Sequence, residues 1–135
     1  MKNRINYVGI ITAIVIAISV FLPWLASSFA GTEGESAKGF EFDDVKITPL
    51  IALIGAFVAF KRIRWAVILI GIICLLQGLL HLAWYLYANK ISSDYSNGAV
   101  GLNPSYGLII FLLASFIFIF STKKVKNVPV DNTAV

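Results

Sequence analysis

Two side chains that could do chemistry in an apolar setting, Gln77 and His81, stand one helical turn apart in a long uncharged run. A neutral imidazole can ligate a haem or chlorophyll-type ring, relay a proton or contact a quinone. His81 is the single histidine of the sequence, so a bis-histidine haem would need a second chain. One interpretation of His81 is therefore a cofactor-binding residue of a redox or pigment-binding subunit.

A hydrogen-bonded cluster between helices is the simpler interpretation of the same two residues. Polar side chains inside hydrocarbon usually face protein and find a partner there. Hydroxyl groups on neighbouring apolar runs could provide that partner, so we expect an intramembrane polar cluster of Gln77, His81, Ser115, Thr12 and Ser19. If several copies lined a path with Gln77 and His81, the protein would be a channel or carrier.

Three carboxylates, Glu41, Asp43 and Asp44, lie close together in the sequence. They lack the ligand spacing of a calcium loop, and nothing nearby supplies a pocket or a second catalytic group for acid–base work. We interpret them as a solvated outer acidic loop. Cys74 is the only cysteine, so no intrachain disulfide can form. The sequence predicts neither a catalytic residue, nor a metal site, nor an enzyme.

The elements that must position these residues are long apolar runs. Of the 135 residues, 59% are hydrophobic and 13% charged, whereas soluble domains are roughly 45–50% apolar and about 25% charged. The net charge of +4 comes from short basic clusters between apolar runs, which suits a membrane surface better than nucleic acid. The composition indicates an integral membrane protein without a separate soluble catalytic unit.

Four of the apolar runs are candidates to cross a bilayer. Thr48-Pro49 and Asn103-Pro104 each resemble a helix start, a capping residue followed by proline. The expected spans are residues 8–26, 47–62, 65–87 and 104–122. The expected fold class is an all-α membrane protein, an antiparallel bundle of four transmembrane helices in residues 1–122, followed by a basic and then disordered tail, 123–135.

Lysine and arginine residues set the expected orientation, because cytoplasmic loops carry the excess of both. Eight of the eleven precede the first span, separate the second from the third, or follow the fourth. Both termini are therefore expected in the cytoplasm. A secretory signal cleaved after Ala30 would leave three spans, but the first apolar run is longer than the roughly 7–15 residues typical of such signals.

Features outside the runs predict the boundaries of the bundle. Residues 40–43 alternate apolar and acidic side chains, and residues 99–102 follow an Asn-Gly turn signal. A small outer β-sheet built from both outer loops is one arrangement that these patterns allow. Aromatic residues near the ends of the runs are interpreted as an interfacial belt: Trp24, Trp65, Trp84, Tyr85, Tyr87 and Tyr106.

Small residues recur every four positions in the first two spans, and this spacing lets helix backbones approach closely in lipid. The expected helix-packing residues are Gly9, Ala13 and Ala17 in the first span, and Ala52, Gly55, Ala56 and Ala59 in the second. Packing within one bundle is the main interpretation. A homo-oligomer interface is the alternative.

Several short motifs carry a resemblance. Leu22-Pro23-Trp24 closes the first run, a glycine-containing loop and a compact second run follow, and Gly107 stands near the start of the fourth. This pattern resembles small four-span bacterial membrane proteins of uncharacterised function, which implies a bacterial cytoplasmic membrane. The topology is also similar to that of claudin-like tetraspans. Residues 27–46 lack the tryptophan and cysteines of the claudin signature, so no tight-junction function is transferred.

The expected function follows from apolar runs with small-residue faces, short loops and no catalytic constellation. We expect a non-enzymatic membrane protein that acts by lateral association, as an accessory subunit of a membrane complex or a self-associating tetraspan. Its expected partners are the lipid bilayer and either another membrane protein or itself.

Overall fold

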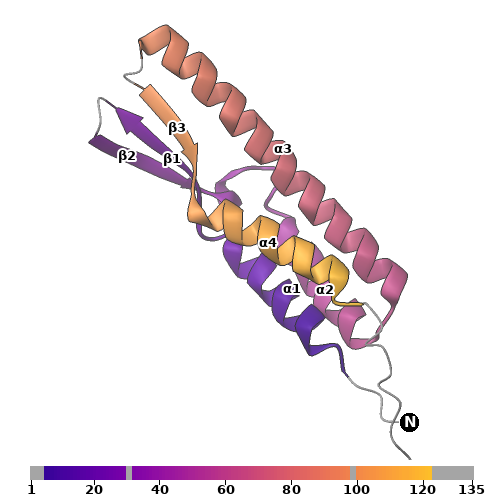
Figure 1. Ribbon diagram of the computed structural model, residues 1–135. Helices are drawn as coiled ribbons and strands as arrows, with labels where there is room; N and C mark the ends of the chain where they lie inside the picture. The colour runs from indigo at the N-terminus through magenta and orange to yellow at the C-terminus, as the bar shows by residue number, and fades with distance from the viewer. Residues whose placement is uncertain (1–4, 30–31, 98–99, 123–135) are drawn as a thin grey trace, which may run out of the picture.

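The computed structural model describes residues 5–29, 32–97 and 100–122. Within these ranges the protein is mostly helical, with four α-helices and one small antiparallel sheet (Figure 1). The elements are α1 (Tyr7–Ser19), β1 (Pro23–Phe29), β2 (Thr32–Lys38), the 3-10 helix η1 (Gly39–Glu41), α2 (Thr48–Phe60), α3 (Arg64–Ser96), β3 (Val100–Pro104) and α4 (Tyr106–Phe120).

Three short helices and one long helix make up the bundle. Helices α1, α2 and α4 lie together at one end, whereas α3 continues past them and flanks the sheet (Figure 1). The 33 residues of α3 extend about 50 Å at 1.5 Å per residue. In the described part of the chain, α3 is the one helix both long and apolar enough to cross a membrane, and the other three are shorter apolar helices.

Helix α1 ends at Ser19, seven residues before the end of the expected first span, 8–26. The amides of Phe21 and Leu22 turn back to carbonyls three residues earlier. Pro23 then has no amide hydrogen with which to continue a helix, and it begins strand β1. Leu22-Pro23-Trp24 is thus the segment in which the chain changes from helix to strand.

The last two helices also depart from their expected bounds. Helix α3 continues beyond residue 87 to Ser96, where Asn97 ends it with a left-handed φ of 53°. The expected start at Asn103-Pro104 is wrong, because both residues belong to β3 and Ser105 is the N-cap of α4. The amide of Leu102 donates to Asn89 Oδ1 over 2.8 Å, which ties β3 to the added length of α3.

A sheet built from both loops is confirmed, with strand order β2-β1-β3. Central strand β1 pairs antiparallel with both neighbours, so that Ala26 lies opposite Ser36 on β2 and Asn103 on β3. The alternation at residues 40–43 allowed either a short strand or a segment along the membrane interface, and the structure has η1 and a turn there in place of a strand. One sheet therefore joins strands from two loops that are more than sixty residues apart in the chain.

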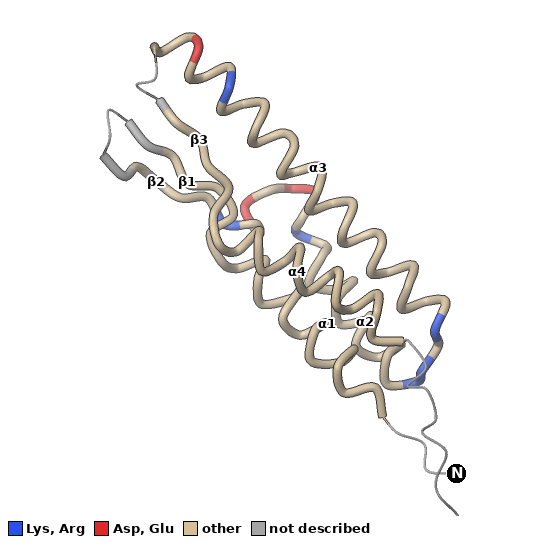
Figure 2. The backbone as a smooth tube through the Cα atoms, viewed as in Figure 1, with Lys and Arg blue, Asp and Glu red and all other residues tan. Residues whose placement is uncertain are grey.

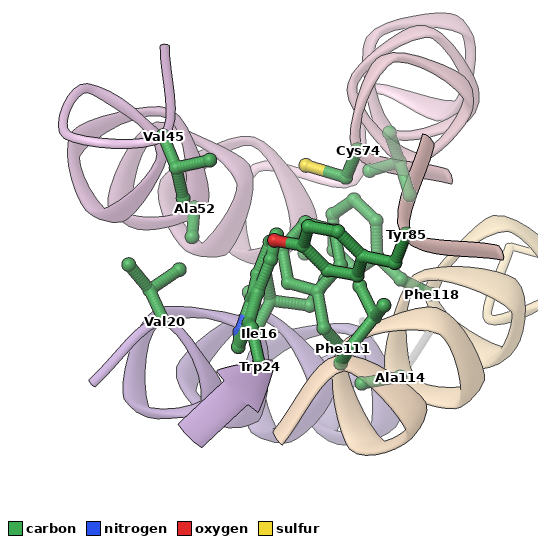
Figure 3. Close-up of a cluster of buried hydrophobic side chains, with 14 residues drawn as sticks. Ile16, Val20, Trp24, Val45, Ala52, Cys74, Tyr85, Phe111, Ala114 and Phe118 are labelled. Atoms are coloured by element: carbon green, nitrogen blue, oxygen red, sulfur yellow. The ribbon is translucent and has the colours of Figure 1, made fainter. Parts of the chain in front are cut away.

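The indole of Trp24 is fully buried where the sheet meets the helices (Figure 3). Its Nε1–H donates to the carbonyl of Ser19 over 2.9 Å, and its ring lies 4.8 Å from that of Phe111 between centroids. A Cβ on Gly39 would come within 2.5 Å of Trp24 Cε2, so η1 begins in van der Waals contact with the indole. Trp24 and the equally buried Tyr85 therefore do not belong to an interfacial belt.

Small residues line two helix interfaces. Helix α1 packs on α2, and a Cβ on Gly9 would lie 3.0 Å from that of Ala59. Of the expected packing residues, Gly9, Ala13, Ala52, Gly55 and Ala59 are buried, and Ala17 and Ala56 are half-buried. The second interface, between α3 and α4, was not expected: Phe118 packs over Gly71, and Phe111 packs over Gly78.

Asn6 joins the start of α1 to the end of α4. Its Oδ1 accepts from the amide of Gly9 over 3.0 Å, which is a standard N-cap. Its Nδ2 donates to Ser121 Oγ over 3.2 Å. The first and last described residues therefore lie at the same end of the bundle as the α2–α3 turn (Figure 1).

Gly107→Ala tests the close approach of α4 to the strand entry. An added Cβ would lie 2.5 Å from the carbonyl oxygen of Pro23 and 2.8 Å from Leu22 Cβ, and a backbone oxygen cannot rotate away. We expect the free energy of unfolding to fall by about 1–3 kcal/mol, measured by denaturant titration of the protein in detergent micelles.

Gly55→Ala is the matched control. Its added Cβ would meet only side-chain atoms, Phe118 Cζ at 3.2 Å and Ile70 Cγ2 at 3.3 Å, and alanine favours helix by about 1 kcal/mol. We expect its stability to stay near that of the wild type. Equal losses in the two variants would contradict the proposed contact with Pro23.

Candidate functional site

The turn of residues 42–47, called here the 42–47 loop, lies against the middle of α3. It is folded by short backbone bonds, from the amide of Val45 to Phe42 O and from that of Thr48 to Val45 O, at 3.0 and 2.9 Å. Val45 is fully buried and anchors the loop in the core. This placement brings Asp44 to the polar residues of α3.

His81 is held at both ring nitrogens. Its Nε2 lies 2.7 Å from Asp44 Oδ2, and its Nδ1 lies 3.2 Å from the hydroxyl of Tyr85. A carboxylate only accepts hydrogen bonds, so Nε2 carries the proton that is donated to Asp44. In the neutral imidazole, Nδ1 then accepts from the tyrosine hydroxyl.

Aromatic rings surround the imidazole. The centroids of Trp24, Phe42 and Tyr85 lie 5.4, 5.2 and 5.6 Å from that of His81. The side chain of His81 is 12% exposed, whereas that of Asp44 is 62% exposed. The pair thus links a buried ring to a carboxylate at the surface.

Gln77 makes a second link between α3 and the loop. Its Oε1 accepts from the Thr48 hydroxyl over 2.8 Å, and its Nε2 donates to the carbonyl of Asp44 over 2.9 Å. Thr48 was expected to cap α2 with its side chain. Instead it is the first residue of that helix, and its hydroxyl turns to Gln77.

The other expected members of the polar cluster lie elsewhere, so the five-residue cluster is wrong. Thr12 Oγ1 donates to Val8 O, Ser19 Oγ to Ile16 O and Ser115 Oγ to Phe111 O, each over 2.7 Å. A helical hydroxyl can reach a carbonyl three or four residues back, and therefore needs no partner on another helix. The sequence did not identify the observed hydrogen-bond partners of Gln77 and His81, which are Asp44, Thr48 and Tyr85. Of these, only Tyr85 could have been found from the sequence, because it lies one helical turn from His81.

The acidic cluster is divided among three partners. Glu41 Oε2 accepts from the amide of Lys38 over 3.3 Å, Asp43 pairs with Lys46 at 2.7 Å, and Asp44 reaches His81. The hydrogen bond and the charge of Lys46 lower the pKa of Asp43. Only Asp44 of the three belongs to the site on α3.

The arrangement does not favour a cofactor ligand at His81. Ligation would need a free ring nitrogen, but one faces Asp44 and the other faces the buried Tyr85. Among the described residues, no group of three histidine, cysteine or carboxylate side chains could hold a metal ion. The hydrogen bonds instead hold the 42–47 loop on α3.

An open pocket of about 480 Å³ lies beside these bonds. We call it the loop pocket, and its lining residues are Phe42, Asp44, Gln77, Leu80, His81 and Trp84. Most of this lining is aromatic or aliphatic, with the Asp44 carboxylate as its one formal negative charge. The loop pocket is the feature of the site most suited to a ligand.

Comparisons with known proteins give no match, whether to a protein-family model, a curated protein or a solved structure.

Gln77→Leu tests the link between the loop and α3. The substitution keeps the side chain's bulk but leaves the Thr48 hydroxyl and the Asp44 carbonyl without their partner. The Thr48 side chain is buried, and leaving a buried polar group unsatisfied costs about 1–3 kcal/mol. We expect faster amide hydrogen exchange in residues 42–48, with little change in α1.

Thr12→Val provides the control, because it removes a hydroxyl that bonds only within its own helix. We expect exchange in residues 42–48 to match the wild type in this variant. If residues 42–48 of the Gln77→Leu variant exchanged at the wild-type rate, Gln77 would not be what holds the 42–47 loop on α3.

Proposed function

We propose that this chain is an integral membrane protein that crosses the bilayer four times with both termini in the cytoplasm. We further propose that it acts without catalysis, by lateral association, as an accessory subunit or a self-associating tetraspan. One observation carries the proposal: all four helices expose large apolar side chains, while their buried polar groups are satisfied within the protein.

The outward faces of the helices are apolar all round the bundle. A soluble protein rarely exposes contiguous apolar patches of more than a few hundred Å², but a bilayer solvates such a surface. The exposed side chains include Ile11, Ile14 and Ile18 on α1, Leu50, Leu53 and Phe57 on α2, Leu69, Ile73 and Leu76 on α3, and Ile109, Leu113 and Phe116 on α4.

The lengths of the helices are compatible with four crossings once the non-helical residues that follow α1 are counted. Helices α1, α2 and α4 have 13, 13 and 15 residues, or about 20–22 Å each against a hydrocarbon core of about 30 Å. Pro23 and Trp24 extend the first crossing as strand, and non-helical backbone is tolerated at this depth where protein covers it. Local thinning of the bilayer would accommodate the remaining mismatch.

Charged residues support the orientation. Lys61, Arg62 and Arg64 lie at the end of the bundle near the N-terminus of α1, and the sheet and the acidic loop lie toward the other end (Figure 2). Lys61 Nζ lies 5.8 Å from the centroid of the Phe57 ring, so its stem folds along the apolar end of α2. This basic end would face the cytoplasm.

Lateral association would use the outward faces, because the small-residue faces are filled internally. Gly9 meets α2, and Gly71 and Gly78 receive side chains from α4. The outward face of α4 instead carries Phe116 and Phe120, whose rings are tilted by 57° to each other with centroids 4.7 Å apart. Rigid apolar and aromatic surfaces of this kind suit van der Waals packing against another helix in lipid.

Cysteine labelling tests the four-span orientation. In a Cys74→Ala background, Ser36→Cys places a thiol on the exposed sheet and Lys61→Cys places one in the basic turn. We expect a membrane-impermeant maleimide to label the first in intact cells and the second only after permeabilisation. Labelling of both in intact cells, or the reverse order, would contradict the orientation.

Photocrosslinking in native membranes tests association. A photoreactive amino acid is placed, one position at a time, at Ile14, Leu53, Leu76 and Leu113, which point outward from the four helices. We expect adducts of one defined mass from one or two of these positions, because a specific interface uses one face. No adduct anywhere, or equal yields at all four positions, would contradict specific association.

A further inference from the structure

The Asp44 carboxylate is the one acidic group that lines the loop pocket. Its Oδ2 accepts from His81, and its side chain is 62% exposed, so Oδ1 can accept from a further donor. Lys46 does not neutralise the pocket, because its ammonium pairs with Asp43 at 2.7 Å. The pocket therefore presents an exposed carboxylate oxygen to which a cation can bind.

Aromatic rings in the lining favour an organic cation over a hydrated metal ion. Phe42 and Trp84 both line the pocket, and ring faces attract ammonium groups within about 6 Å of the centroid. Asp44 is the only carboxylate among the lining residues, too few oxygen ligands for a hard metal ion. An ammonium group satisfies both features of the lining.

An apolar track leads away from the pocket toward the bundle. Leu80 is 71% exposed and Trp84 56%, and Leu76, one helical turn before Leu80, is also exposed. The 42–47 loop crosses α3 near its middle (Figure 2), at the outer boundary of the proposed membrane-spanning part. A hydrocarbon chain could follow this track while its headgroup meets Asp44.

We propose that the loop pocket binds the ammonium headgroup of a phospholipid from the outer leaflet, with an acyl chain along Leu80 and Leu76. The ammonium pairs with the Asp44 carboxylate and lies against the rings of Phe42 and Trp84. This proposal rests on the proposed membrane location. A lipid with an anionic headgroup is disfavoured, because it would place its charge against Asp44.

Native mass spectrometry of the full chain tests this selectivity. The purified protein is stripped of lipid and offered phosphatidylethanolamine, phosphatidylcholine and phosphatidylglycerol of identical acyl chains in equal amounts. We expect the wild type to retain the two ammonium lipids roughly three- to tenfold better than phosphatidylglycerol. Equal retention of all three would overturn the proposal.

Asp44→Asn removes the charge but keeps an oxygen that can accept from His81 Nε2, so the loop should stay in place. We expect its preference for ammonium lipids to disappear. Glu41→Gln is the matched control, because Glu41 is a nearby carboxylate outside the pocket lining that accepts from the amide of Lys38, and this variant should keep the preference. The proposal fails if Asp44→Asn keeps the wild-type preference, or if Glu41→Gln loses it equally.

Trp84→Leu tests the aromatic contribution, with the exposed Trp65→Leu at the other end of α3 as its control. We expect only Trp84→Leu to weaken retention of both ammonium lipids, and equal effects of the two substitutions would contradict the contact.

Cysteine labelling separates the two proposals. A chain that inserts as expected but shows no headgroup preference overturns the pocket alone, and one that fails to insert overturns the four-span arrangement.

Discussion

The indole of Trp24 lies where the helical bundle meets the sheet, and it touches elements from every part of the chain. The Nε1–H of Trp24 donates to the carbonyl of Ser19, the last residue of α1. The backbone carbonyl of Trp24 accepts from the amide of Ser105 at the start of α4. Its ring packs near Phe111 and the His81 imidazole, and Gly39 fits beneath it. If this ring were absent, the strand that follows α1 would lose its fixed position against α3 and α4. This buried, hydrogen-bonded side chain therefore fixes the sheet on the bundle, together with the backbone bond from Ser105 and the bond between Leu102 and Asn89.

The polar site extends from this contact. Trp24, Phe42 and Tyr85 enclose the His81 ring, so the imidazole can be held at both nitrogens while the rest of its surface stays apolar. Gln77 and His81 then fasten the 42–47 loop to α3 with bonds of 2.7–2.9 Å. The same loop leaves the Asp44 carboxylate facing outward beside exposed aromatic and aliphatic side chains, and the lipid pocket proposed here follows from that position.

Local patterns in the sequence anticipated several elements and missed the contacts between them. The small residues of α1 and α2 are buried, and both outer loops contribute to one sheet. The end of the first helix was misplaced, because an apolar run does not reveal where Pro23 converts it to a strand. The hydroxyls of Thr12, Ser19 and Ser115 were assigned to Gln77 and His81, whereas a helical hydroxyl can be satisfied by its own backbone. Asp44 could not be identified as the partner of His81, because it lies thirty-seven residues away in the chain.

The sequence by itself determined the properties that depend on composition and short-range spacing: four apolar helices, small-residue stripes, a basic end and a polar pair one turn apart on α3. These follow from helical periodicity and from the cost of placing charge in an apolar medium. Only the tertiary structure decided that β1 is the central strand, that Trp24 packs against Gly39 and that Asp44 meets His81. Those contacts join segments far apart in the chain, so they depend on how side chains pack in three dimensions and leave no periodic signal in the sequence.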